Sequence, residues 1–267
     1  MASGLDAIVL LSRGSDVIGV EANPAVREHD QKLSAVSAQP YAGKLTLVSA
    51  VVVTESDRMQ AYISGDGTVP FYENILRADW SSNNRPDSSK FYDVNQTIEH
   101  RIPAISCPEL LRQFGPSDAW KIDLEGMDTL CIADLLSAGM PPPSIISVEF
   151  PVDGEGHESL KLLRLLQTWG FQHFKFSRQS TYAPRCWPGR LNCHGAPIMD
   201  TRGHSTSLSG LLGDAAVDYV SGTHWRQFSD WENEIGRLLK LSKAPWFERF
   251  DVHACLSPWS TVLSFPG

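Results

Sequence analysis

The chain has 267 residues, of which 42% are hydrophobic and 20% are charged, and its formal net charge is −8. This composition is typical of one large globular domain, or of one domain with an appendage. The acidic balance, with no block of Lys or Arg, argues against nucleic acid or a membrane surface as the main partner. No apolar run approaches the roughly 18 residues that span a bilayer.

Cysteine usage indicates a cytoplasmic protein. An odd number of widely spaced cysteines favours reduced thiols over a disulfide framework: Cys107, Cys131, Cys186, Cys193 and Cys255. The apolar residues 7–11 are too few for a secretion signal and lack basic residues before them. Several Cys and His residues match no common zinc-ligand spacing, so we predict no metal site there: His173, Cys186, Cys193, His194 and His204.

The first predicted strand is Val17–Glu21, a near-continuous apolar run of the kind found in parallel strands covered on both faces. Residues 4–11, which precede it, look like the first turns of a helix. After the strand, Asn23 followed by Pro24 predicts a helix start, because asparagine caps a helix and proline suits its first position.

A second strand is predicted over residues 45–53, which are rich in β-branched side chains, and residues 60–63 are expected to pair nearby. Residues 64–95 are polar and punctuated by glycine and proline, which predicts a long loop. Loops of this length in a compact domain are usually functional or mobile. The segment Trp80-Ser81-Ser82 within it either faces a ligand or lies at the surface as ordinary loop.

The stretch from Trp120 to Leu136 organises the chain and follows a short predicted helix over residues 107–114. Its first six residues alternate apolar and charged side chains, as a strand does. Gly126 then breaks this pattern, and apolar residues recur at helical spacing. Asp123 and Glu125 therefore lie at the carboxyl end of a strand, where ligands bind in open α/β sheets. Alternatively, the two acids only cap the following helix, since acids favour a helix N-terminus.

The alternation of strands and helices continues toward the C-terminus. We predict a buried strand over 145–150, a helix over 160–169, a strand over 171–176, no periodic structure over 178–222, a helix over 225–241 and an irregular tail or final strand. This order indicates an α/β protein with a doubly wound, mostly parallel sheet. We divide the chain into a core of residues 1–178 and an irregular C-terminal extension of residues 179–267 that packs on it.

Glu21 is the first candidate binding residue, because it ends the strand of a βα unit. A carboxylate has two oxygens and so suits the two neighbouring hydroxyls of a ribose. The alternative is an acid that simply faces solvent at a strand end.

Several motifs together resemble the FkbM family, which are class I methyltransferases that use S-adenosylmethionine. The resemblance covers roughly residues 4–179. In chain order the motifs are VIGVEANP at Val17–Pro24, SAVV at Ser49–Val52, IPAISCPELL at Ile102–Leu111, KIDLEGMD at Lys121–Asp128 and SVEF at Ser147–Phe150. VIGVEANP and KIDLEGMD are the most specific of them.

The resemblance implies a cofactor site and a reaction. Glu21 would hold the ribose and Gly4 would belong to the glycine turn beside the methionine part, and the residues expected at the cofactor are Gly4, Glu21, Asn23, Ala50 and Asp123. Asp123 and Glu125 would lie where methyl transfer occurs. The family mostly methylates hydroxyl groups of sugars or natural products, so a small-molecule or carbohydrate acceptor is expected. A carboxylate can accept the proton that the alcohol loses, and Asp123 is the preferred candidate.

The chain departs from the family at its start, where only Met1, Ala2 and Ser3 precede Gly4. We therefore expect the first strand of the sheet to be missing or replaced. Apart from this, we expect one parallel sheet. Its strands that end at Glu21, Val53, Asp123 and Phe150 should lie side by side or one strand apart. A non-catalytic nucleoside-binding remnant is one alternative. A nicotinamide-dependent oxidoreductase is another, although the chain has no complete G-x-G-x-x-G turn.

Overall fold

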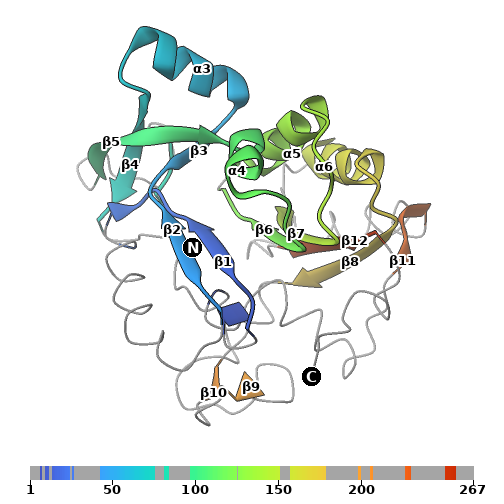
Figure 1. Ribbon diagram of the computed structural model, residues 1–267. Coiled ribbons are helices and arrows are strands. Elements are labelled where there is room, and N and C mark those ends of the chain that lie inside the picture. The colour runs from blue at the N-terminus through green and yellow to red at the C-terminus, as the bar shows by residue number, and fades with distance from the viewer. Residues whose placement is uncertain are drawn as a thin grey trace. The chain divides into compact units, whose positions relative to one another are not determined.

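The computed structural model describes residues 7, 10–11, 14–24, 26, 43–75, 81–83, 97–124, 126–150, 157–178, 198–199, 205–206, 226–229 and 250–256. The chain divides into a first unit, residues 1–113 and 200–203, and a second unit, residues 114–199 and 204–267. Figure 1 labels the helices and strands of both units. Each unit has its own sheets, so the two are described in turn.

The first unit begins with a parallel pair of strands, β1 (Val17–Val20) and β2 (Leu45–Val48). Two hydrogen bonds fix their register, because the Val17 amide donates to the Lys44 carbonyl at 2.8 Å and the Lys44 amide donates to Asp16 Oδ1 at 2.7 Å. Gly43 has no alternative here: a Cβ at this position would lie 2.0 Å from the Ser15 carbonyl oxygen.

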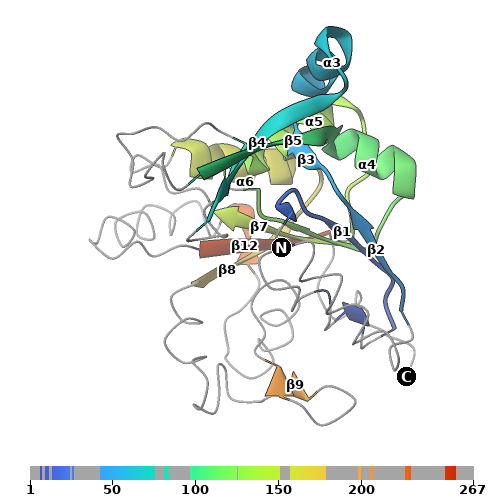
Figure 2. The same cartoon turned by 90° about the vertical axis from the view of Figure 1, so that its left-hand side faces the viewer.

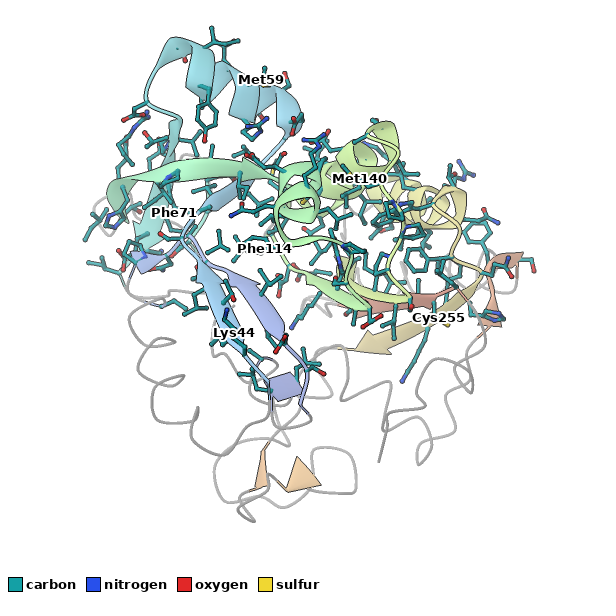
Figure 3. The ribbon with its side chains drawn as sticks, in the orientation of Figure 1. Lys44, Met59, Phe71, Phe114, Met140 and Cys255 are labelled. Atoms are coloured by element: carbon teal, nitrogen blue, oxygen red, sulfur yellow. The ribbon has the colours of Figure 1, made fainter. Side chains whose placement is uncertain are left out.

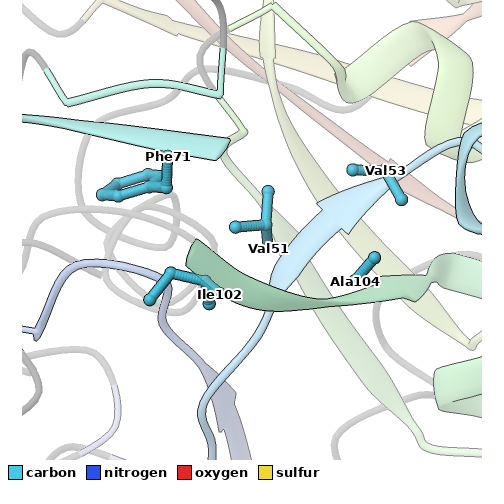
Figure 4. Packing of buried hydrophobic residues seen from close by; sticks show 5 residues of the cluster. All are labelled: Val51, Val53, Phe71, Ile102 and Ala104. Carbon is cyan, nitrogen blue, oxygen red and sulfur yellow. The ribbon is translucent and has the colours of Figure 1, made fainter. Parts of the chain in front are cut away.

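A second sheet of the first unit has the order β3-β5-β4. Its strands are β3 (Val51–Val53), β4 (Thr68–Asn74) and the central β5 (Thr97–Ser106), which pairs in parallel with β3 and antiparallel with β4. Figure 4 shows the apolar side chains that gather on one face of this sheet, namely Val51, Val53, Phe71, Ile102 and Ala104. Ala22, from the turn after β1, packs against the same cluster.

Helix α3 (Glu55–Ser64) follows β3 and has no buried side chain. Its first turn is capped by Thr54, whose Oγ1 accepts a hydrogen bond from the Asp57 amide at 3.0 Å. Met59, labelled in Figure 3, is 48% exposed. Burial of apolar area therefore contributes little to the stability of this helix. Polar contacts at its N-terminus stabilise it instead. Helix α4 (Cys107–Phe114) continues directly from β5.

The largest sheet belongs to the second unit and has the order β11-β8-β12-β7-β6. Only β6 and β7 are parallel neighbours, since β12 runs antiparallel to both β7 and β8, and β11 runs antiparallel to β8. The strands are β6 (Ala119–Ile122), β7 (Ile145–Phe150), β8 (His173–Arg178), β11 (Arg226–Gln227) and β12 (Phe250–Cys255). A short antiparallel pair, β9 (Ile198–Met199) and β10 (Ser205–Thr206), stands apart from this sheet.

Helices α5 (Asp128–Ser137) and α6 (His157–Thr168) lie side by side on one face of this sheet, as Figures 1 and 2 show. Their apolar faces and the strands form the main core, in which these side chains are fully buried: Ile132, Leu135, Ile146, Val148, Leu162, Leu163, Leu166 and Phe174. The ends of the two helices are tied together, because Trp169 Nε1 donates to the Met140 carbonyl at 2.8 Å.

The expectation of one doubly wound sheet is met only in part. The fold is mixed α/β with three parallel strand pairs among the described residues, but β1 and β6 belong to separate sheets, and β3 pairs with β5. The predicted strand over 45–53 is two strands, because the chain changes partner at Ser49 and Ala50. Among the described residues, β1 pairs only with β2, and its Ile18 is exposed, so it is not covered on both faces.

Other expectations are also corrected. Residues 60–63 belong to α3, and part of the predicted loop 64–95 is strand β4. Within the predicted helix 225–241, residues 226–227 form strand β11 instead. The alternative of a final strand in the tail is confirmed by β12.

The cysteines fall into two groups among the described residues. Cys107 and Cys131 each take part in a disulfide bond, so the expectation of reduced thiols is wrong for both. Cys255, labelled in Figure 3, is a free and buried thiol. Burial raises the pKa of the Cys255 thiol to about 12, which keeps it neutral.

None of the helices that the structure describes is long and apolar enough to cross a membrane.

The core of the second unit leads to a prediction about helix α5. Replacing the fully buried Ile132 with alanine should lower the free energy of unfolding by about 2–5 kcal/mol, because the change removes buried methyl groups and leaves a cavity. Leu130→Ala in the same helix is the matched control, since Leu130 is 40% exposed, and it should change stability by about 0.5 kcal/mol or less. Urea unfolding measures both, and equal losses would contradict the packing described here.

Candidate functional site

The turn after β1 carries the first candidate binding residue, Glu21. Its amide donates to the Val48 carbonyl at 3.0 Å, which keeps Glu21 attached to the end of the β1–β2 pair. Its Oε1 accepts a hydrogen bond from the Asn23 amide two residues later at 2.8 Å. The side chain is therefore held by its own turn, at the carboxyl end of a parallel strand pair, where ligands commonly bind.

The side chain of Asn23 points into the protein instead of towards solvent. Asn23 is 2% exposed, and its Nδ2 donates to Ser81 Oγ at 3.1 Å. The same Ser81 Oγ accepts a hydrogen bond from the Asn74 amide at 3.1 Å. Next to it, Ser82 exchanges two backbone hydrogen bonds with Tyr72 of β4, at 2.8 and 3.1 Å. The Trp80-Ser81-Ser82 segment thus includes a buried hydroxyl that joins the β1 turn to the end of β4.

The turn after β6 carries the second candidate, Asp123, whose side chain is exposed. The carboxylate that organises this turn is that of Asp128, in the first turn of α5. Its Oδ1 accepts from the Leu124 amide at 3.0 Å, and its Oδ2 accepts from the Gly126 amide at 3.2 Å. Gly126 has φ = +104°, a conformation that side chains disfavour. Asp128 thus holds the turn before α5, and the start of the helix itself, at Met127, has no hydrogen bond from a capping side chain.

Asp128 is an acid whose pKa is raised. Burial is the largest cause, and the nearby charge of Asp123 adds to it, whereas hydrogen bonds from the Leu124 and Gly126 amides act in the opposite direction. Asp128 is 5% exposed. The turn that presents Asp123 is therefore held by a carboxylate that is costly to keep charged.

A third polar cluster lies where the parallel strands β3 and β5 end. Glu55 accepts a hydrogen bond from the Ser106 hydroxyl and forms an ion pair with Arg58 at 3.0 Å. Arg58 is also 3.0 Å from Glu109, and Ser106 Oγ accepts the Glu109 amide at 3.3 Å. The hydrogen bond from Arg58 is the main cause that lowers the pKa of Glu55. Because every charge in this cluster has a partner, its evident role is to hold α3 against α4.

The remaining predicted residues have different outcomes. Ala50 is described and is buried, 4% exposed, at the break between β2 and β3. Gly4 and Glu125 lie outside the described residues. So do four of the Cys and His residues considered for zinc, namely Cys186, Cys193, His194 and His204. Within the described residues, no group of three or more His, Cys, Asp or Glu side chains could hold a metal ion.

Sequence reasoning missed the role of Asp128, and it considered Ser81 only as part of the Trp80-Ser81-Ser82 segment, which was expected to face a ligand or to lie at the surface. Asp128 is the last residue of the KIDLEGMD motif, and its position at the start of a helix was the signal that could have identified it. Ser81 had no such signal, because its partner Asn23 is 58 residues away in the chain.

Comparison of the chain with models of protein families, with curated proteins and with solved structures gave no match.

The buried carboxyl group of Asp128 predicts a pH-dependent contribution to stability. Because its pKa is raised in the folded state, its contribution is fully present below the unfolded pKa, about 3.9, and is lost as the pH rises through the folded pKa. The free energy of unfolding of the natural chain, minus that of Asp128→Asn, should therefore fall as the pH rises from about 3. Urea unfolding of both proteins over a pH series measures this difference. A difference that grows with pH would contradict the assigned direction.

Proposed function

We propose that the chain is an S-adenosylmethionine-dependent methyltransferase that methylates a hydroxyl group of a sugar or another small molecule. The observation that carries the proposal is the position of Glu21. It follows directly on a parallel strand, and its carboxylate is fixed by the Asn23 amide. A carboxylate offers about four lone-pair sites, so the bond from its own turn does not by itself exclude bonds from a ribose diol.

The strand pairing of each unit supports a doubly wound plan. In the order 3-2-1-4-5-6, the second and third strands are neighbours, and so are the fourth and fifth. β1 and β2 correspond to the second and third strands of that order and pair in parallel. β6 and β7 correspond to the fourth and fifth strands and also pair in parallel. Glu21 follows the first strand of one pair, and Asp123 follows the first strand of the other.

The proposed roles follow from the chemistry of methyl transfer to oxygen. S-adenosylmethionine supplies an electrophilic methyl group. An alcohol that attacks it loses a proton, and Asp123 is the proposed acceptor of that proton. Asp123 is exposed and stands on a turn that Asp128 holds through two backbone amides. Fixed positioning of this kind supports catalysis, because alignment provides much of the acceleration.

Two other functions are compatible with an acid at position 21. A non-catalytic nucleoside-binding protein would bind the cofactor and transfer nothing. A nicotinamide-dependent oxidoreductase would bind a dinucleotide through a glycine-rich turn, but the chain has no complete G-x-G-x-x-G sequence. Titration calorimetry with S-adenosylmethionine and with NAD, followed by a transfer assay with labelled methyl groups and a panel of sugars, separates the three. Binding of NAD alone, or of neither compound, would overturn the proposal.

Glu21 should dominate the affinity for the ribose. Glu21→Ala should weaken binding of S-adenosylmethionine by about 2–3 kcal/mol, because charge-assisted hydrogen bonds contribute about 1.5–3 kcal/mol. Glu99→Ala, which removes an exposed acid from β5, is the matched control and should bind normally. Calorimetry measures both affinities. Unchanged affinity in a folded Glu21→Ala protein would remove Glu21 from the site.

Asp123 should be required for transfer more than for binding. Asp123→Asn should slow methyl transfer by about 10²–10⁴-fold, the usual contribution of a general base, and leave cofactor affinity nearly unchanged. Asp118→Asn replaces another exposed acid just before β6 and should transfer at the normal rate. The assay counts labelled methyl groups on the acceptor. Full activity in Asp123→Asn would contradict this role and assign the base to Glu125 or to another group beside the acceptor.

A further inference from the structure

We infer that Ser81 is a positioning residue for the ribose diol and acts on Glu21 through Asn23. The inference rests on the proposed function and goes beyond it, because it assigns the discrimination of the ribose hydroxyls to a buried hydroxyl from a distant part of the chain. Ser81 does not contact the ligand in this assignment. It sets the conformation of the turn that does.

The chain of contacts is short and continuous. Glu21 Oε1 accepts from the Asn23 amide, Asn23 Nδ2 donates to Ser81 Oγ, and the Asn74 amide donates to the same oxygen. Asn23 and Asn74 are buried, and Ser81 is 9% exposed. A buried donor that loses its acceptor has no water to replace it, so these three bonds hold one another in place.

Ser81 is itself firmly placed. A serine hydroxyl has two lone pairs, and here both are directed at N–H donors that come from different segments. The two backbone bonds between Ser82 and Tyr72 keep this part of the chain along β4. The hydroxyl is therefore a fixed point to which the Asn23 side chain is attached.

The turn has a second, apolar attachment to the same sheet. Ala22, which lies between Glu21 and Asn23, packs against the cluster that contains Phe71 of β4. The contact of Ala22 with this cluster limits how far the turn can move, whereas the Asn23–Ser81 hydrogen bond fixes the rotation of the turn. Loss of the Ser81 hydroxyl should thus leave the turn in place but remove one of the bonds that orient Asn23, and so loosen the amide that bonds the Glu21 carboxylate.

This role predicts a loss of selectivity in addition to a loss of affinity. A carboxylate held in one orientation can bond both ribose hydroxyls, and removal of either hydroxyl leaves a bond unmade. A carboxylate that is free to rotate gains less from the second hydroxyl. Adenosine and 2′-deoxyadenosine, which differ in one hydroxyl, are therefore suitable probes.

The experiment is titration calorimetry of the full chain with these two nucleosides and with S-adenosylmethionine. The natural chain should bind adenosine about tenfold more tightly than 2′-deoxyadenosine, as expected for one hydrogen bond to a charged group. Ser81→Ala should weaken adenosine binding about five- to tenfold and 2′-deoxyadenosine binding far less, so that the ratio falls toward one. Ser64→Ala is the matched control, because Ser64 is exposed and its hydroxyl donates to the Gln60 carbonyl of its own helix.

A double-mutant cycle tests whether Ser81 acts through Asn23. If it does, adding Ser81→Ala to Asn23→Ala should change adenosine affinity by less than twofold. Additive effects would assign Ser81 a separate role and overturn the inference. A thermal unfolding scan of each variant identifies those that do not fold, and Ser81→Thr, which keeps the hydroxyl, then replaces Ser81→Ala as the test of retained selectivity.

The outcomes separate this inference from the proposed function. A natural chain that binds neither S-adenosylmethionine nor adenosine overturns the proposed function, and this inference with it. A natural chain that prefers adenosine, together with a Ser81→Ala protein that keeps the same preference, overturns the inference alone. A Ser81→Ala protein that is less stable but equally selective shows that Ser81 is only structural, which also overturns it.

Discussion

Backbone amides at the end of a strand need acceptors, and in this chain side-chain oxygens supply them. After β1, the Glu21 carboxylate accepts a hydrogen bond from the Asn23 amide. The Thr54 hydroxyl accepts one from the Asp57 amide after β3, and the Ser106 hydroxyl accepts one from the Glu109 amide after β5. After β6, Asp128 accepts the amides of Leu124 and Gly126. The amides that open a turn or a helix have no partner within the helix, and burying them unpaired would be costly. The shape of each turn follows from this requirement.

The four acceptors differ in what else they can do. Ser106 and Thr54 have neutral hydroxyls that also donate hydrogen bonds, Ser106 to Glu55 and Thr54 to Asp57. Both residues lie beside the charged cluster that holds α3. Asp128 is buried, and both of its oxygens are engaged by the turn. Glu21 is half-buried, and its Oε1 accepts a hydrogen bond from the Asn23 amide. An acceptor of that last kind combines a fixed direction with access for a ligand, which is why Glu21 carries the proposed function.

Much of the local structure could be predicted from the sequence, and for clear reasons. The helix over 107–114, the strand before Asp123 and the strand over 145–150 are close to their predicted bounds, because their apolar residues recur with the period of a helix or a strand. The errors fall where polar residues predominate. Helix α3 buries no side chain, and its large apolar residues, Met59, Tyr62 and Ile63, are exposed and confined to residues 59–63. β4 contains Pro70 and lies at the edge of its sheet, where proline is tolerated although it suggests a loop.

The sequence by itself determined which segments are strands or helices along most of the described chain, and which acids stand at strand ends, because both depend on neighbours in the chain. Only the tertiary structure decided which strands pair, that the run from 45 to 53 divides between two sheets, and that the last strand, β12, enters between β7 and β8. It also decided that a serine 58 residues away holds Asn23. Hydrogen bonds between distant segments leave no periodic trace in the sequence, since any buried acceptor in the right place satisfies the same donor.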